Sequence, residues 1–256
     1  MSGESSIPSS DFLEETKRIL AAAEKKGVLL RVLGALAFYL HCPKHRMMQH
    51  ALGREFTDID FVSYGKYRGA VTRLFLELGY QEDPYVSRLA GGTRLLFLDT
   101  ANQRHSDVFF NELRFSHTIP FKGRLELDYP TISPVDLFLE KMQIVQLNEK
   151  DIIDTYMLLR EHELGSQRPE TIDIDYLAAL CSDRWGLWRT VTLNLRKLLA
   201  FLDVYSIDKG GKEEIAQKIA KIQSRIESEP KSVKWKMRSL VGEKVRWYRH
   251  VEEVFR

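Results

Sequence analysis

The chain has 256 residues, of which 44% are hydrophobic and 29% charged, which is the composition of a globular protein with a substantial core. No stretch approaches the roughly 20 apolar residues that cross a bilayer, and the N-terminus lacks the basic start and apolar core of a secretory signal. The two cysteines, Cys42 and Cys181, show no paired spacing, so we expect no disulfide framework. These features exclude membrane-spanning and disulfide-stapled classes and predict a cytoplasmic protein without a membrane partner.

The first half of the chain alternates between helical and extended patterns. Ser10 or Asp11 can cap a helix that runs to about Lys26, and Gly34 turns the chain between a strand and a short helix. A basic loop, KHRMMQHALGR, precedes the second strand. The predicted strands cover 28–33, 56–63, 93–99 and 105–110, and the predicted helices after the first cover 35–41 and 66–79.

From Ser133 onward the pattern is helical throughout. Further helices are predicted at about 173–182, 186–203, 211–228 and 232–254. The fold class is therefore α+β, with a small mixed-sheet domain over 1–130 and an all-helical domain over 131–256. Residues 209–256 hold 13 Lys and Arg against 7 Asp and Glu, so the C-terminal end is distinctly basic.

Three acids are the strongest chemical signal. Asp58 and Asp60 are two residues apart on a predicted strand, so both carboxylates point to one face. Such a pair is unfavourable unless a cation or a proton offsets the charge, and Asp107 adds a third acid in the apolar strand HSDVFF. Read otherwise, Asp58 and Asp60 are solvated turn residues and Asp107 caps a strand.

Carboxylates from two strands can hold two Mg²⁺ ions about 4 Å apart, the arrangement used in nucleotidyl transfer from an NTP. Gly34 follows a strand and opens a helix, which lets backbone N–H groups approach a phosphate. The order is strand, glycine turn, helix, Asp-x-Asp strand and then a single acid on a later strand, as in the DNA polymerase β-like superfamily. We therefore predict Asp58, Asp60 and Asp107 as metal-binding and catalytic residues.

The sequence resembles bacterial nucleotidyltransferase-like proteins related to the abortive-infection (type IV toxin) nucleotidyltransferase family. The stretches LRVLGALAFYLH, REFTDIDFV, SDVFF and SPVDLFLEKMQIVQLNEKDIIDTYMLL carry the resemblance, and RWGLWRTVTLNL with PKSVKWKMRSLVGEKVRWY looks like one branch's C-terminal region. The resemblance implies a Mg²⁺-dependent enzyme that moves an NMP from an NTP to a hydroxyl of RNA, tRNA or protein. It also implies a catalytic domain over 1–130, an acceptor-binding domain over 131–256 and an antitoxin protein partner.

By motif, the resemblance assigns four further residues to the nucleotide site. Gly34 and Ala35 occupy the family's small turn, which is usually Gly-Gly or Gly-Ser, and 23 residues separate Gly34 from Asp58, more than the motif normally shows. Lys141 in LEKMQ and Asp154 in KDIID match the lysine and acid that complete the site in the toxin relatives. A solvated helix face is the alternative for Lys141, whereas Asp151 in NEKD is expected to cap a helix.

Two other clusters and two rival functions remain open. His41, Cys42 and their neighbouring histidines contain zinc-ligand types without the spacing of a closed site, so a phosphate-contacting or solvated basic loop is favoured. Trp235, Trp247 and Tyr248 are interleaved with Lys and Arg, which suits RNA binding but also an amphipathic helix with core aromatics. The rival functions are an RNA-binding or scaffold protein that retains the fold without the reaction, and a glycosyltransferase that uses Asp-x-Asp.

Overall fold

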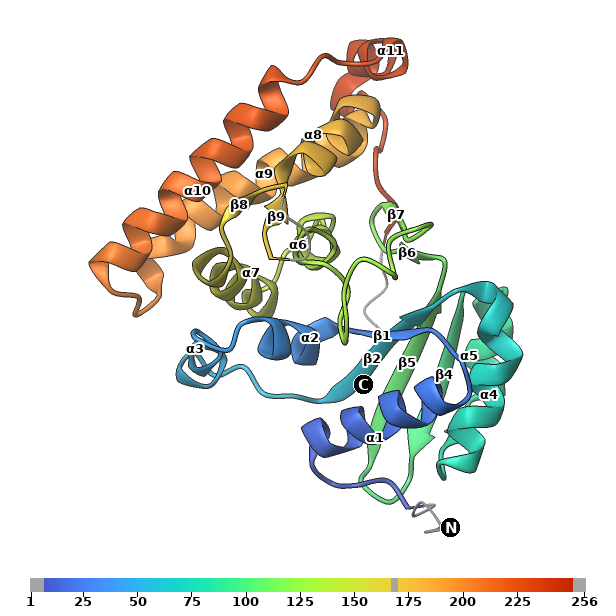
Figure 1. The fold of residues 1–256 in the computed structure, drawn as a ribbon. Coiled ribbons are helices and arrows are strands. Elements are labelled where there is room, and N and C mark those ends of the chain that lie inside the picture. Colours follow the sequence, from blue (N-terminus) through green and yellow to red (C-terminus); the bar gives the residue numbers. More distant parts are fainter. Residues whose placement is uncertain (1–6, 167–169, 251–256) are drawn as a thin grey trace. The chain divides into compact units, whose positions relative to one another are not determined.

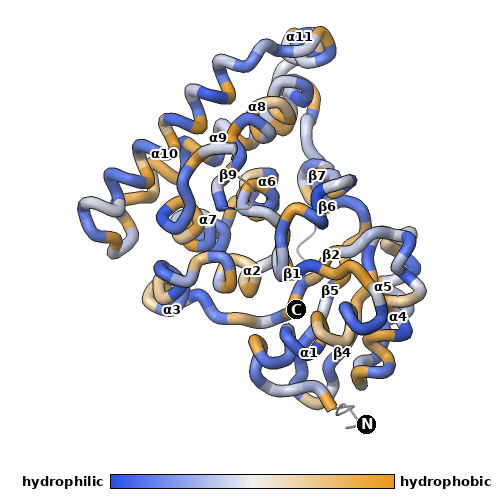
Figure 2. The backbone as a smooth tube through the Cα atoms, in the orientation of Figure 1, coloured by the Kyte–Doolittle hydropathy of each residue, from blue (hydrophilic) through white to orange (hydrophobic). Residues whose placement is uncertain are grey.

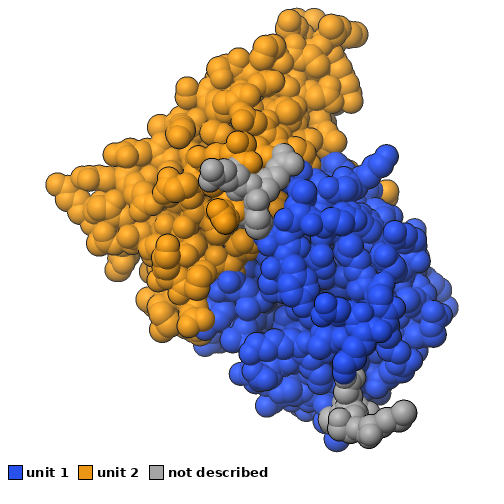
Figure 3. Space-filling model, in the orientation of Figure 1, with its two compact units in different colours: residues 1–40, 55–113, 120–132 blue, residues 41–54, 114–119, 133–256 orange. Residues whose placement is uncertain are grey.

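The structure, a computed structural model, describes residues 7–166 and 170–250 and shows an α+β protein (Figure 1). A mixed five-stranded sheet with helices forms the N-terminal part, and the C-terminal part is largely helical. Two compact units divide the chain (Figure 3): unit 1 comprises residues 1–40, 55–113 and 120–132, and unit 2 comprises 41–54, 114–119 and 133–256. In the described part of the chain, no helix combines the length and apolar character needed to cross a membrane.

Unit 1 begins with a capped helix. Asp11 accepts hydrogen bonds from the backbone N–H groups of Leu13 and Glu14, as the sequence predicts for an N-cap. The remaining predicted strands and helices of this part are present with shifted ends, and β3 and α5 were not predicted. The elements are α1 (Phe12–Lys25), β1 (Leu30–Leu33), α2 (Gly34–His41), β2 (Asp58–Ser63), α4 (Arg68–Glu77), β3 (Gln81–Glu82), α5 (Pro84–Leu89), β4 (Arg94–Asp99) and β5 (Arg104–Phe110).

The sheet order is β1-β2-β5-β4-β3. Strand β2 pairs antiparallel with β1 and parallel with β5, and β4 pairs antiparallel with both β5 and β3. One face of the sheet packs on α4, where the ring of Phe75 lies 5.9 Å from that of Phe61 and 4.3 Å from that of Phe97. Because side chains alternate along a strand, Asp58 and Asp60 of β2 and Asp107 of β5 project from the other face.

Unit 2 is built mainly from helices, which range from α6, buried all round, to α10, which buries one apolar stripe. In α10, Ile215, Ile219, Ile222 and Ile226 recur at helical spacing and are buried, and short hydrophobic and hydrophilic segments alternate along the tube of this helix (Figure 2). The helices are α3 (Met47–Ala51), α6 (Pro134–Met142), α7 (Glu149–Glu161), α8 (Ile174–Asp183), α9 (Trp185–Phe201), α10 (Lys209–Ser228) and α11 (Val233–Val241).

Two expectations for the second half are wrong in detail. The region is not all-helical, because β8 (Leu164–Gly165) and β9 (Ile172–Asp173) form a two-stranded parallel sheet. The helix predicted over 232–254 ends at Val241, since Gly242 follows with a φ of +57°, and residues 251–254 lie outside the described residues. Strands β6 (Glu112–Arg114) and β7 (Thr118–Pro120) form a further small sheet that was not predicted.

Candidate functional site

Three carboxylates lie on one face of the sheet in unit 1. Asp58 and Asp60 are two residues apart on β2, and Asp60 is the register partner of Asp107 on the parallel strand β5. Neighbouring strands are about 4.8 Å apart and register partners point to the same face, so Asp60 and Asp107 lie side by side. On the opposite face, Ile59 and Phe61 are fully buried. The alternation of apolar and acidic residues thus fixes which way the acids point.

The glycine turn lies directly against Asp60. Strand β1 ends at Leu33, the antiparallel register partner of Asp60, and Gly34 follows with a φ of +72°. A Cβ atom added at residue 34 would lie 2.6 Å from Asp60 Oδ2. Glycine is therefore required at position 34 for two reasons: its backbone has a left-handed conformation, and the Asp60 carboxylate lies where a Cβ atom would be. Because α2 starts at Gly34, the N–H groups of its first turn, including that of the buried Ala35, lie at the Asp60 end of β1.

The third acid is held by an arginine. Arg94 Nε donates to Asp107 Oδ1 at 2.6 Å, and Arg94 Nη2 donates to Oδ2 at 2.8 Å. The Asp107 side chain is 4% exposed and that of Arg94 is 25% exposed. This two-bond pairing of guanidinium and carboxylate is the strong, directional form of an ion pair. In this structure Asp107 is therefore neutralised by a side chain of its own unit.

Arg94 is the site residue that sequence patterns did not single out. The hairpin register contained the signal. Asp99 pairs with Arg104 next to the turn, and moving away from the turn along both strands makes Leu96 the partner of Asp107. Arg94 lies two residues before Leu96 and so on the same face as Asp107. The loose predicted loop left the hairpin register undetermined, and one residue of slip would have placed Arg94 on the other face.

The donor set suits Mg²⁺ chemically, because carboxylate oxygens are the hard ligands that this ion prefers. Over residues 7–166 and 170–250, however, no group of three or more His, Cys, Asp or Glu side chains is arranged to hold a metal ion. Asp107 uses both oxygens on Arg94. Asp58 and Asp60 are the other two acids on this face, and Asp107 can join them in holding a divalent cation only after Arg94 has moved.

Within unit 2, Lys141 and Asp154 form part of one buried charge cluster. Lys141 Nζ lies 3.3 Å from Asp154 Oδ2, 3.2 Å from Glu140 Oε1 and 3.5 Å from Asp151 Oδ1. Burial lowers the pKa of Lys141, but the charges of the three carboxylates outweigh it and leave that pKa raised. The structure therefore brings together the two residues that the resemblance pairs, and it contradicts the alternative of a solvated Lys141.

The segment between α2 and β2, predicted as a basic loop, contains the short helix α3 and supplies further partners to Asp154. Gln49 Nε2 donates to Asp154 Oδ1 at 2.8 Å, and Arg54 Nε lies 3.7 Å from Asp154 Oδ2. These contacts explain why residues 41–54 belong to unit 2. The predicted capping role of Asp151 is confirmed, since Asn148 and Asp151 exchange hydrogen bonds in a capping box.

The histidines at the end of α2 and just after it have different partners. His41 Nδ1 lies 3.2 Å from His162 Nε2, while His45 Nδ1 lies 3.0 Å from Glu161 Oε2. Cys42 is fully buried, and this burial raises the pKa of its thiol. A buried thiol of raised pKa is a poor metal ligand, because the thiolate is the form that binds.

The aromatic residues considered for RNA binding contact other aromatic rings within unit 2. The ring of Trp235 lies 5.1 Å from that of Trp188, and the ring of Trp247 lies 6.0 Å from that of Trp185 and 5.2 Å from that of Tyr248. Such edge-to-face contacts are those of a packed aromatic cluster. This arrangement favours packed aromatic residues over exposed platforms for RNA bases. Trp235 lies on α11, whereas Trp247 lies beyond the end of that helix at Val241.

Comparison with protein-family models, with curated proteins and with solved structures finds no match for this chain. The resemblance to the abortive-infection nucleotidyltransferases therefore rests on the quoted motifs alone.

Proposed function

We propose that this protein is a Mg²⁺-dependent nucleotidyltransferase that moves an NMP from an NTP to a hydroxyl acceptor. The observation that carries the proposal is the placement of Gly34 against Asp60, with Asp58 and Asp107 on the same face. A phosphate-binding turn and metal-binding acids must lie next to each other if both are to contact the same triphosphate. In this chain the pairing of β1 with β2 supports that adjacency.

Each residue has a distinct part in this scheme. Asp58 and Asp60 hold the cation, and the backbone N–H groups after Gly34 bind phosphate oxygens. Mg²⁺, when bound, neutralises charge on the triphosphate and lowers the pKa of the acceptor hydroxyl. Asp107, released from Arg94, accepts the acceptor's proton as a general base.

The bonds and charges of the reaction balance without a further reactant. The acceptor oxygen forms a bond to the α-phosphorus of the NTP while the bond from that phosphorus to the bridging oxygen of pyrophosphate breaks. The electron pair of the broken bond leaves with pyrophosphate. The proton of the acceptor hydroxyl passes to Asp107 and then to solvent.

Arg94 couples nucleotide binding to this chemistry. A guanidinium binds phosphate as readily as carboxylate, so a triphosphate arriving on this face competes with Asp107 for Arg94. Transfer of Arg94 to the phosphates frees the carboxylate of Asp107 and adds a positive charge where the leaving group develops negative charge. The resting ion pair thus keeps Asp107 inactive until substrate is present.

The acceptor and the partners are further proposals. The basic C-terminal end suits an RNA or tRNA acceptor, since phosphate contacts dominate nucleic-acid affinity. An antitoxin protein and a nucleotide-binding role for Lys141 and Asp154 follow from the resemblance. The contacts of Lys141 with three carboxylates support a stabilising role for it within unit 2.

Two observations favour a second function, a scaffold or RNA-binding protein that retains the fold without the reaction. The two-bond pairing of Arg94 with Asp107 and the alanine at position 35 are both features that a silent site would accumulate. Such a protein binds RNA without Mg²⁺ or NTP.

The glycosyltransferase alternative is distinguished by ligand. A ligand panel that includes UDP-glucose tells it apart from the nucleotidyltransferase, because a glycosyltransferase binds the nucleotide-sugar.

Transfer of label tests the proposal. The protein is incubated with each α-³²P-labelled NTP, Mg²⁺ and total RNA, and the labelled species are resolved by electrophoresis. We expect one NTP to label RNA or protein, and D58N/D60N to abolish that labelling, while the matched surface control D203N retains it. Asp203 is suited to this control because its side chain is 96% exposed. Labelling that persists in D58N/D60N would exclude these acids as the site.

A further inference from the structure

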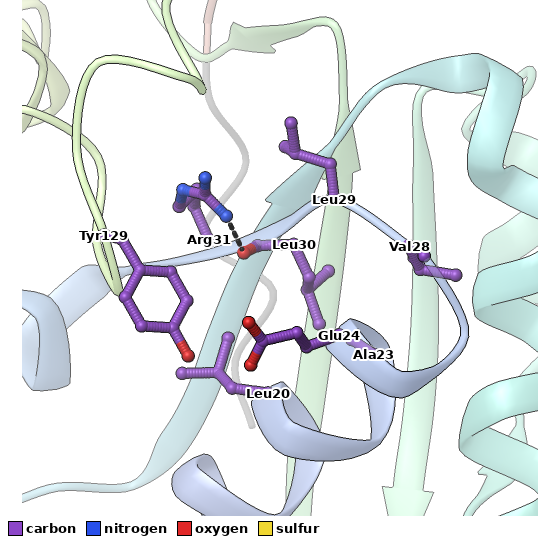
Figure 4. A pocket seen from close by; sticks show the side chains of 9 residues that line it. Leu20, Ala23, Glu24, Val28, Leu29, Leu30, Arg31 and Tyr129 are labelled. Carbon is purple, nitrogen blue, oxygen red and sulfur yellow. Dashed lines mark hydrogen bonds between the residues drawn. The ribbon is translucent and has the colours of Figure 1, made fainter.

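Unit 1 contains a pocket of about 270 Å³ that none of the proposed catalytic residues lines. It lies between the C-terminal end of α1, the start of β1 and Tyr129 (Figure 4). Its lining consists of Leu20, Ala23, Glu24, Gly27, Val28, Leu29, Leu30, Arg31 and Tyr129. Most of these side chains are apolar, and the exceptions are an acid, a guanidinium and a phenol.

The Arg31 guanidinium at this pocket is half-buried and has only neutral hydrogen-bond acceptors. Its Nε donates to the carbonyl oxygen of Asp128 at 2.6 Å, and Nη1 donates to that of Leu30 at 2.8 Å. Within the described ranges, Arg31 takes part in no ion pair and Nη2 donates to no protein acceptor. Burial lowers the pKa of Arg31, and the nearby charges of Tyr129, Glu126 and Asp128 offset this only in part.

Because the direct acceptors of this guanidinium are neutral carbonyl groups, an anion that reaches Nη2 gains a charge-assisted hydrogen bond. The guanidinium presents donors in a fixed fork, of which two directions are already used by carbonyl groups. The free side of the fork fits one carboxylate. This is the polar half of a ligand site.

The remaining lining supplies the apolar half. Leu20, Ala23 and Leu30 are almost fully buried and form an aliphatic floor. Arg31 lies 5.2 Å from the ring centroid of Tyr129, and that tyrosine is 57% exposed at the rim (Figure 4). Polar and apolar groups thus share the lining of this pocket, and a few placed polar groups are what orient a ligand in small-molecule sites.

Glu24 restricts the charge of the occupant. Its carboxylate lines the same pocket, comes from α1 and lies among the apolar side chains in the close view (Figure 4). A polyanion such as a triphosphate would be repelled by the Glu24 carboxylate, and Arg31 alone in this lining would have to offset its several negative charges. A ligand with one negative charge at one end and an uncharged body avoids that repulsion.

We propose that this pocket binds a small organic monocarboxylate, with the carboxylate on Arg31 and an aromatic or aliphatic body between the α1 side chains and the Tyr129 ring. The site is independent of the nucleotidyl-transfer proposal, because its residues and its ligand class both differ from those of the carboxylate face. Occupation would fix the loop that carries Tyr129 against β1.

The test is a ¹⁹F NMR titration of the full chain with 4-fluorophenylacetate, in EDTA and without nucleotide. We expect line broadening with a dissociation constant of about 1 mM, and binding at least about tenfold weaker for the uncharged analogue 4-fluorophenylacetamide. R31Q should weaken carboxylate binding about tenfold, and E24Q should strengthen it roughly twofold by removing a like charge. The matched control R73Q, at an exposed arginine of α4, should leave binding unchanged.

E24Q keeps the proposal testable if R31Q fails to fold, because Glu24 is exposed and R31Q alone removes the contact with the Asp128 carbonyl group. Equal binding of acid and amide, no binding up to about 10 mM, or tighter binding of phenyl phosphate than of the carboxylate would each overturn the assignment. None of these outcomes depends on Mg²⁺ or NTP, so they are distinct from a failure of the proposed transferase.

Discussion

Arg94 pairs with both oxygens of Asp107, at 2.6 and 2.8 Å, on the sheet face that also carries Asp58 and Asp60. Arg94 therefore forms its ion pair with the acid on β5, the strand next to the one that carries the Asp-x-Asp motif. The pair stabilises a nearly buried carboxylate and also withholds it from any cation. These two consequences can be measured separately.

Removing the guanidinium of Arg94 should lower the stability of the protein and increase its stabilisation by Mg²⁺. We expect R94Q to lower the free energy of unfolding by about 2 kcal/mol, because Asp107 keeps a buried charge without its cation. Mg²⁺ should then raise the melting temperature of R94Q more than that of the wild type. Urea denaturation with and without Mg²⁺ measures both effects. The control R94Q/D107N should recover stability and lose the added response, and an unchanged Mg²⁺ response in R94Q would contradict the account.

A methyl group at Gly34 should disturb both the backbone and Asp60. The positive φ costs an L-residue about 1–2 kcal/mol, and the Cβ atom would displace Asp60 Oδ2 from its present position. Gly123 is the matched control, since its φ is +67° and a Cβ atom there would meet nothing within 4 Å. Thermal unfolding should show a loss for both variants, and the loss for G34A should be at least as large as that for G123A. G34A alone should lose the response to Mg²⁺ and NTP, so an unaltered response in G34A would argue against the turn.

Lys141 should be required for the stability of unit 2. K141M leaves three carboxylates around an uncharged side chain, so we expect a loss of about 3–5 kcal/mol in urea denaturation. Because the pKa of Lys141 is raised on folding, its stabilising charge is fully present below the ordinary lysine pKa of about 10.4. The deficit should therefore persist unchanged across neutral pH. K150M, at an exposed position of α7, should cost less than about 0.5 kcal/mol.

His117 predicts a loss of stability in mild acid. Burial, together with the charges of Arg249 and Arg184, lowers its pKa from 6.5 to about 4. Between these values the unfolded chain binds a proton that the folded chain does not, so stability falls as the pH drops from 6.5 toward 4. The full effect is about 3 kcal/mol, at 1.36 kcal/mol for each pKa unit. H117Q should remove this part of the acid dependence and H50Q should not; parallel pH profiles for wild type and H117Q would contradict it.

Local patterns were enough to predict the face that carries the acids. A spacing of two on a strand fixes the common orientation of Asp58 and Asp60. The lone acid Asp107 in the apolar strand HSDVFF identified the second strand that contributes to this face. The glycine turn followed from Gly34 between a strand and a helix. These features depend on residues close in sequence, and so a single sequence contains them.

The remaining contacts depend on pairings between distant residues. Arg94 required the register of β4 with β5, and the burial of Lys141 required the packing of α6 on α7. Gln49 and Arg54 reach Asp154 across about 100 residues of chain, which the basic composition of their loop gave no reason to expect. Periodicity also overextended the last helix, because a single glycine at Gly242 ended it.

The most direct test of the central claim is a thermal-shift panel of ATP, CTP, GTP, UTP and UDP-glucose, with and without Mg²⁺, on the wild type and on D58N/D60N. The account predicts that one NTP stabilises the wild type only with Mg²⁺, and that the double variant folds but loses this shift. The absence of any nucleotide-dependent shift in the wild type, or a shift that survives in D58N/D60N, would contradict the account.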